Sequence, residues 1–281
     1  MVCQSLKTGN YNCRWLGILI VVNHSKSGGL IFSTNCLWLL GLREAASKRA
    51  IEAMCWMRKI SSPFNSCMSL YYLSMHDCFC GSYQGAMEKA AEAKSLSVEH
   101  NFSMFEGWGS IIHGWSRAKA GNFLGGIDEI RGGRSILQAN GAAAHTCFAT
   151  GLLAEALLDN CEFEEALTLL DQSIEISSKT GENFWRAELY RLKGEALILS
   201  GAGDDKVEEK CFEKALGIAG KQHALSLELR AALSLGQLLA DRGRGPDAGA
   251  LLGEVYGRFT EGFDTPDLLR AKAFLDVCNS T

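Results

Sequence analysis

Small residues recur along this sequence with a period of about 40. Turn-like residues separated by 40, 40, 40, 42 and 40 positions are Gly41, Gly81, Gly121, Cys161, Gly203 and Gly243. The residues seven positions before them are Thr34, Ser74, Gly114, Ala154, Ala196 and Gly236. Five and twelve positions after them stand Ala46 and Ala53, Ala86 and Ala93, Gly126 and Gly133, Ala166 and Ser173, Glu208 and Ala215, and Ala248 and Val255. Of these 18 positions, 16 hold Gly, Ala, Ser or Thr, where composition alone predicts about six. The chain is therefore built from a repeated structural unit.

Each repeat is predicted to be a helical hairpin. Two antiparallel helices whose axes lie roughly 8–10 Å apart need small side chains where they approach. A glycine between them can take the left-handed conformation that ends the first helix. The predicted helices span 31–40 and 43–60, 65–80 and 83–100, 103–120 and 123–139, 143–160 and 163–179, 184–200 and 205–220, and 225–241 and 246–258.

The predicted fold is an all-α, right-handed α-solenoid. Six hairpins occupy 30–264, with turns near 41, 81, 121, 161, 203 and 243. Thr265, Pro266 and Asp267 supply an N-cap hydroxyl, a first-turn proline and an acid near the positive helix end. Residues 265–281 are therefore predicted to hold a capping helix, over 265–277, and a short tail. Residues 1–29 match no repeat and are predicted to form a separate N-terminal segment.

The turn glycine, the aromatic residue two positions later and the alanine three beyond that resemble tetratricopeptide repeats (TPRs), here with a longer period. Three stretches, 181–195, 226–232 and 259–268, narrow the resemblance to the C-terminal repeats of large bacterial ATP-binding regulators. In that family a class III nucleotide cyclase or a winged-helix DNA-binding module precedes an AAA/STAND signalling ATPase, and the repeats follow. The resemblance implies a sensor or autoinhibitor of the ATPase.

Composition and motifs exclude several function classes. The chain has 28 basic and 32 acidic residues, so no positive excess indicates a nucleic-acid partner. The longest apolar run, 15–22, is too short to span a membrane. The sequence has no Gly-x-x-x-x-Gly-Lys-Ser/Thr loop to hold nucleotide phosphates. The 11 cysteines form no Cys-x-x-Cys pair, which favours reduced thiols and a cytoplasmic location.

No catalytic or metal site is predicted. His76 and Cys80 are four residues apart on a predicted helix and could share one face, but no second ligand pair has a matching spacing. The six histidines form no pattern with a nucleophile and a carboxylate. We therefore expect a protein that is not an enzyme and that carries no cofactor.

Two sets of residues are candidates for a binding function. The first helix of each hairpin lines the concave side of such solenoids, where Trp and Tyr are efficient anchors. The residues predicted to face this groove are Tyr71, Met75, Trp108, Trp115, Glu155, Tyr190, Lys193, Arg230 and Gln237. A polar network between repeats is predicted from Glu188, Arg191, Glu195 and Glu228, because Glu188 and Glu228 are 40 residues apart and Arg191 can pair with Glu195 at i, i+4.

The predicted function is a protein-interaction or sensor scaffold that binds a protein, peptide or effector in its groove. One alternative is a regulatory subunit that acts in trans on a separately encoded ATPase or cyclase. Another is a truncated gene fragment without independent activity. The short first hairpin, 31–60, is further predicted to leave an apolar face for self-association.

Overall fold

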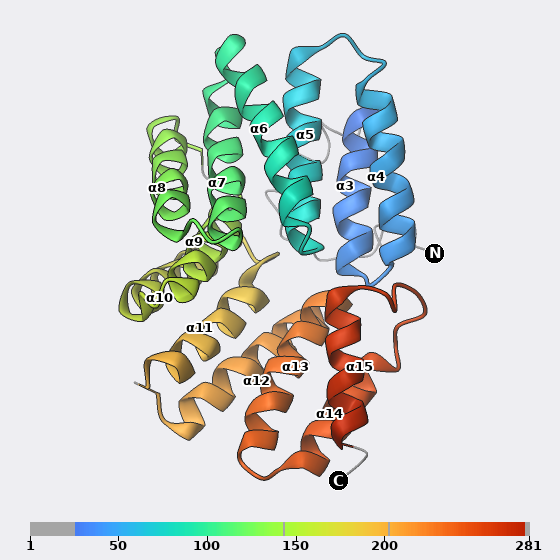
Figure 1. Cartoon of the computed structure of the whole chain (residues 1–281), viewed down its shortest axis with the longest axis vertical. Coiled ribbons are helices and arrows are strands. Elements are labelled where there is room, and N and C mark those ends of the chain that lie inside the picture. The colour runs from blue at the N-terminus through green and yellow to red at the C-terminus, as the bar shows by residue number, and fades with distance from the viewer. Residues whose placement is uncertain (1–25, 143, 202, 279–281) are drawn as a thin grey trace.

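The repeats form a continuous array of paired helices. The computed structural model describes residues 26–142, 144–201 and 203–278. In these ranges it contains thirteen helices and no strand (Figure 1). The helices are α3 (Lys26–Leu39), α4 (Arg43–Met57), α5 (Pro63–Phe79), α6 (Tyr83–Glu99), α7 (Ser103–Lys119), α8 (Phe123–Ala139), α9 (Thr146–Asp159), α10 (Phe163–Thr180), α11 (Arg186–Ser200), α12 (Asp205–Lys221), α13 (Leu225–Asp241), α14 (Gly245–Tyr256) and α15 (Pro266–Cys278). The prediction of an all-α fold of helical hairpins is confirmed.

The first helix is longer than the sequence predicts. It begins at Lys26 rather than at 31, so residues 26–29, predicted to belong to the non-repeat segment, are helical. Ser27 and Gly28 are buried in this first turn, and packing there overrides the loop character of Ser-Gly-Gly. The rest of the predicted N-terminal segment, 1–25, lies outside the described residues.

The turns follow the predicted period with one displacement. Gly41, for example, has φ +82°, the left-handed conformation that glycine adopts at low cost. Cys161 takes the same conformation, with φ +62°, although it has a side chain. In the fifth hairpin the left-handed residue is Gly201 rather than Gly203, because α12 begins only at Asp205 and the two inserted residues lengthen the turn.

All 18 repeat positions that carry the period are buried. The closest approach is between α7 and α8, where backbone meets backbone. A Cβ atom on Gly114 would lie 2.6 Å from the Gly126 carbonyl oxygen, and one on Gly133 would lie 2.6 Å from the Gly107 carbonyl oxygen. These two glycine pairs therefore set the distance between the axes of α7 and α8.

We predict that Gly114→Ala destabilises the chain. The alanine methyl group would force two helix backbones apart, at a cost of about 1–3 kcal/mol in the free energy of unfolding. The matched control is Gly132→Ala on α8, where a Cβ atom meets nothing within 4 Å and the higher helix propensity of alanine gives about 1 kcal/mol of added stability. Urea unfolding measures both, and a Gly114→Ala chain as stable as the Gly132→Ala chain would contradict the prediction.

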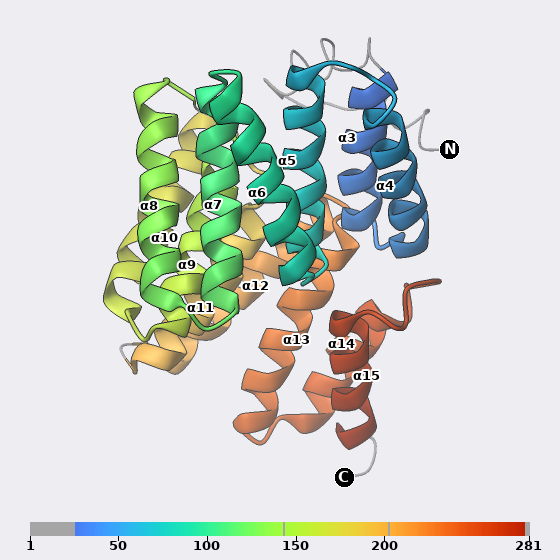
Figure 2. The ribbon, with the colours of Figure 1, turned by 45° about the horizontal axis from the view of Figure 1, so that its top comes forward.

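The two ends of the array meet. The Ser226 hydroxyl on α13 donates to the Trp38 carbonyl at the end of α3, with 2.5 Å between the oxygens. The Arg230 guanidinium donates to the Phe79 carbonyl at the end of α5, at 2.7 Å. In Figures 1 and 2 the start of α15 lies close to the turn between α3 and α4. We call this junction of the first and last repeats the seam.

Candidate functional site on the inner face

The first helices of the hairpins, together with α15, form an inner layer. Each of these helices contacts the next one of its kind, from α3 through α5, α7, α9, α11 and α13 to α15, and α13 also contacts α3. Because the series returns to its beginning, side chains that point to the centre of the superhelix meet one another. This geometry decides which of the predicted groove residues are accessible.

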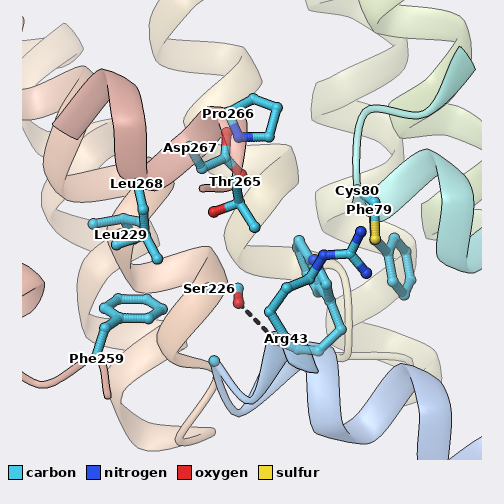
Figure 3. A pocket seen from close by; sticks show the side chains of 12 residues that line it. Arg43, Phe79, Cys80, Ser226, Leu229, Phe259, Thr265, Pro266, Asp267 and Leu268 are labelled. Atoms are coloured by element: carbon cyan, nitrogen blue, oxygen red, sulfur yellow. Dashed lines mark hydrogen bonds between the residues drawn. The ribbon is translucent and has the colours of Figure 1, made fainter. Parts of the chain in front are cut away.

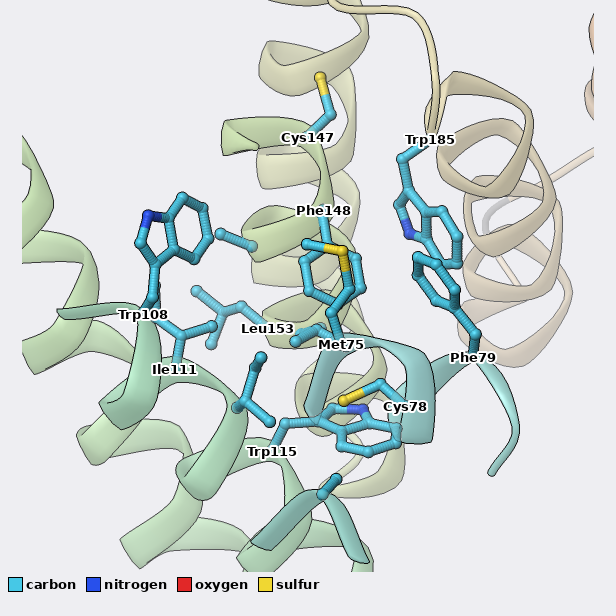
Figure 4. Packing of buried hydrophobic residues seen from close by; sticks show 14 of the residues in the cluster. Met75, Cys78, Phe79, Trp108, Ile111, Trp115, Cys147, Phe148, Leu153 and Trp185 are labelled. Atoms are coloured by element: carbon cyan, nitrogen blue, oxygen red, sulfur yellow. The ribbon is translucent and has the colours of Figure 1, made fainter. Parts of the chain in front are cut away.

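Aromatic side chains fill one half of the inner face. Phe79 is at their centre: its ring stacks on Trp185 with 4.8 Å between the centroids, and the Phe148 ring lies 5.7 Å away (Figure 4). The centroid of the Trp38 ring lies 4.9 Å from that of Phe79. These four rings come from α3, α5, α9 and the start of α11, so they join helices that are far apart in the sequence. Phe79 is 1% exposed.

A buried histidine occupies a second aromatic cluster. The Tyr71 hydroxyl lies 2.7 Å from His145 Nδ1, and the His145 ring is surrounded by Tyr71, Tyr72, Trp108 and Phe184. Burial lowers the pKa of His145 to about 3. The imidazole is therefore neutral at physiological pH and belongs to the core.

The prediction that Tyr71, Met75, Trp108 and Trp115 anchor a partner in the groove has to be corrected. Each is only 2–3% exposed and belongs to the hydrophobic core cluster. Figure 4 shows Met75, Trp108 and Trp115 in this packing. The helical period places these side chains on the inner side, as expected. In the described part of the chain, however, neighbouring inner helices cover them, so they form hydrophobic core.

Tyr190 and Lys193 also differ from the prediction. The Lys214 ammonium of α12 lies 5.4 Å from the centre of the Tyr190 ring, and Lys193 pairs with Asp171 of α10. Both side chains therefore reach toward the second helices of the hairpins, away from the inner layer. Gln237 is exposed and donates to Asp241 on its own helix.

Charged side chains line the other half of the inner face. We call them the inner ion-pair series, and they are Lys119, Glu155, Asp159, Glu188, Arg191, Glu195, Arg230 and Asp267. They extend over α7, α9, α11, α13 and α15. Lys119 pairs with Asp159 and Arg191 pairs with Glu188, each at 2.7 Å.

The predicted polar network lies within this series, except for one residue. Arg191 pairs with Glu188 and Glu195, and the Ser234 hydroxyl donates to Glu195 at 3.0 Å. Burial alone would raise the pKa of Glu188, but the guanidinium groups of Arg191 and Arg230 hold it below its ordinary value. Glu188, Arg191 and Glu195 thus stabilise one another on α11, and Arg230 of the next repeat adds a second positive charge beside Glu188.

Glu228 does not join this network, which corrects the prediction. Both of its carboxylate oxygens accept from Arg258, at 2.6 and 2.7 Å. Arg258 follows α14, and the equivalent position one repeat earlier is the apolar Ile218. An arginine specific to the last hairpin therefore draws Glu228 away from the inner face.

Trp115 and Glu155 connect the aromatic and charged halves. The Trp115 indole nitrogen donates to Glu155 at 3.0 Å, and Lys119 lies 3.4 Å from the same carboxylate. Glu155 is 17% exposed, while Asp159 and Glu195 are 36% and 35% exposed. Asp159 and Glu195, and to a lesser extent Glu155, are thus the acids of the inner face that a partner can reach.

A small cavity of about 30 Å³ lies at the seam (Figure 3). Its walls include Trp38, Phe79, Phe259, Arg43, Cys80 and Asp267. The Arg43 guanidinium points toward Cys80 (Figure 3) and lies 3.2 Å from His76 Nε2. The sequence does not indicate this cavity, because its walls come from both ends of the chain.

His76 and Cys80, considered as a metal pair from their spacing, do face each other, with 3.5 Å between Nε2 and Sγ. Burial, with the charges of Arg43 and Lys89, lowers the pKa of His76 to about 3, and burial raises the pKa of Cys80 to about 12. The thiol is therefore protonated and a cation sits beside the imidazole. Among the described residues no group of three or more His, Cys, Asp or Glu side chains is arranged to hold a metal ion.

The chain was compared with family models, curated sequences and solved structures, and only solved structures are similar to it. No family model matches the chain, and no curated protein sequence matches it. Among solved structures, a Rap protein complexed with competence and sporulation factor is similar with a TM-score of 0.62 and 14% identity, over 97% of this chain and 70% of that one. The fold is TPR-like.

Two further structures support this assignment. NprR in complex with its cognate peptide NprX has a TM-score of 0.62 and 12% identity, over 90% of this chain and 71% of that one. A STAND protein with a tetratricopeptide repeat sensor, from Pyrococcus horikoshii, has a TM-score of 0.52 and 13% identity, over 91% of this chain and 38% of that one. At these identities the TPR-like fold is what the likeness establishes. No helix in the described part of the chain is both long and apolar enough to cross a membrane.

Proposed function

We propose that the chain is a protein- or peptide-binding scaffold without catalytic activity. The observation that carries the proposal is the inner ion-pair series, which runs across five successive inner helices and keeps acidic groups partly exposed. An extended surface built from equivalent positions of consecutive repeats suits an elongated partner. The similar Rap and NprR structures are complexes with competence and sporulation factor and with the peptide NprX, respectively, which supports a partner of this kind.

Capture from the source cytosol tests this proposal. The bait is the full chain, and the variant Asp159→Asn/Glu195→Gln removes the two most exposed acids of the series. The control Glu52→Gln/Glu175→Gln removes two exposed acids, 56% and 66% exposed, from α4 and α10. We expect a protein or peptide that the wild type and the control retain and that the inner-face variant loses. Equal retention by both variants would contradict the inner face as the binding surface.

The finer proposal is that this array is the repeat tail of a cytoplasmic signalling ATPase of the cyclase or winged-helix type. The sequence resemblance over 181–277 supports it, as does the structural similarity to the sensor-bearing STAND protein. Action in trans on a separately encoded ATPase or cyclase is the alternative. An ATPase without repeats encoded beside this chain favours action in trans, and a continuous reading frame upstream favours a tail.

Self-association through the first hairpin stays a prediction. On α4 the exposed side chains are Glu44, Lys48, Ile51, Glu52 and Cys55, and Ile51, 65% exposed, is the large apolar one. This face is more polar than the sequence-based prediction assumes.

A further inference from the structure

The loop that joins α14 to α15 crosses the seam and contacts the first hairpin. We call this loop, residues 257–265, the strap. Its Glu261 carboxylate accepts hydrogen bonds from the backbone N–H groups of Glu44 and Ala45, at 2.7 and 3.1 Å. These are among the first N–H groups of α4, which have no partner within their own helix.

Glu261 replaces a cap that α4 lacks. The residue before the helix is Leu42, whose side chain makes no capping hydrogen bond. A carboxylate at this end is favourable, because the N-terminus of a helix carries partial positive charge. The cap thus comes from a residue 217 positions away, so it forms only when the superhelix is closed.

Phe259 contributes the second contact of the strap. Its ring covers Gly41, where a Cβ atom would lie 2.9 Å from Phe259 Cε1. Phe259 is 8% exposed and also forms a wall of the seam cavity (Figure 3). The strap therefore makes two contacts with the turn of the first hairpin. The Phe259 ring packs on Gly41, and Glu261, two residues further along the strap, accepts hydrogen bonds from two backbone amides of α4.

We propose that the strap is an internal ligand, and that an acidic peptide with an aromatic residue two positions before its carboxylate displaces it and opens the seam. This goes beyond the scaffold proposal, because the strap site lies at the seam, apart from the exposed acids of the inner ion-pair series, and takes a partner of its own. The site uses backbone amides and a glycine surface, and these accept a ring and a carboxylate from another chain as well as from the strap.

The competition is one of mass action. A strap tethered to the same chain acts at an effective concentration on the order of millimolar, so the wild type disfavours an added peptide. A peptide shifts the equilibrium to the open form only to the extent that it binds the open form more tightly. Weakening the strap without removing it should therefore expose the site.

The test uses the strap's own sequence as the probe. A fluorescent peptide of residues 258–264, Arg-Phe-Thr-Glu-Gly-Phe-Asp, is titrated by anisotropy against the full wild-type chain and the full Phe259→Ala/Glu261→Gln variant. We expect binding to the variant at least tenfold tighter than to the wild type. The matched peptides carry Glu261→Gln or Asp264→Asn, which have equal net charge, and only the first should lose binding, by at least tenfold. Absence of binding to a folded variant, or equal loss with both peptides, overturns the proposal.

Amide hydrogen exchange gives a second measurement, which does not need the Phe259→Ala/Glu261→Gln variant. In the full chain with Glu261→Gln alone, the amides of Glu44 and Ala45 should exchange at least tenfold faster than in the wild type, and the unmodified peptide should restore their protection. Asp264→Asn, which changes an exposed acid of the same strap, should leave this exchange unchanged. Unchanged exchange in Glu261→Gln overturns the proposal. If the capture experiment fails but the strap peptide binds the variant, the inner face is refuted as a binding surface and the strap site is supported.

Discussion

Replacing Phe79 with alanine is expected to lower the free energy of unfolding by about 3–5 kcal/mol. The ring is 1% exposed and touches Trp38, Phe148 and Trp185. Its removal leaves a void that four helices border, and these helices are held apart by the rest of the inner layer. Because the surroundings cannot collapse freely, the cost should fall at the upper end for a buried aromatic residue.

Two variants separate the causes of this effect. Phe79→Leu keeps most of the volume but loses the ring geometry, which is worth about 0.5–1.5 kcal/mol per aromatic pair. Phe64→Ala removes a phenylalanine from the same helix that is 48% exposed, and it should cost roughly 1 kcal/mol. Urea denaturation monitored by circular dichroism measures all three. If Phe79→Ala costs no more than Phe64→Ala, Phe79 is not the centre of the core.

Acidification from pH 7 to pH 5 is expected to reduce stability by about 4 kcal/mol, about 2 kcal/mol for each of two buried histidines. Burial lowers the pKa of His76 and of His145 to about 3, whereas an unfolded histidine has a pKa of about 6.5. Between these values the unfolded chain binds protons that the folded chain excludes. The stabilisation is therefore complete above about pH 6.5 and is lost as the pH falls toward 3.

Buried acids act in the opposite direction. Burial raises the pKa of Asp77 and of Glu182, so the folded chain keeps protons there that the unfolded chain has released. Their contribution grows as the pH falls, which is why comparison with histidine variants is needed. His76→Gln and His145→Asn should each remove about half of the loss between pH 7 and pH 5, since asparagine tolerates the left-handed backbone of His145.

Chemical denaturation at pH 7, 6 and 5 provides the measurement. The wild type should take up close to two protons on unfolding near pH 5, and each single variant close to one. If stability depends on pH in the same way in the wild type and in the His76→Gln/His145→Asn double variant, neither histidine is the source of the dependence.

The repeat itself is readable from the sequence, because its cause is local. Gly114 and Ala154 are small because a second helix passes within a few ångströms, and that requirement returns every 40 residues. The left-handed turns follow the same period for a similar reason. Only the fifth turn differs, because two inserted residues give the chain a choice between Gly201 and Gly203.

The accessibility of the inner face could not be read in the same way. The period places Trp108 and Trp115 on the inner side, but their exposure depends on how strongly the array curves. That curvature is fixed by contacts such as Ser226 with Trp38, which join residues 188 positions apart. A single pair of this kind produces no repeating pattern in the sequence. The seam cavity and the role of Glu261 could not be predicted for the same reason. Glu228 is absent from the inner ion-pair series because it pairs with Arg258, a residue with no counterpart in the preceding repeat.

Joining the first repeat to the last also changes how the array should come apart. A linear stack of repeats melts from its ends inward, since each terminal unit has only one neighbour. Here α3 and α13 contact each other, so the first and the sixth hairpin each have a second neighbour. The hairpins should consequently unfold cooperatively, in one transition, rather than one after another from the ends.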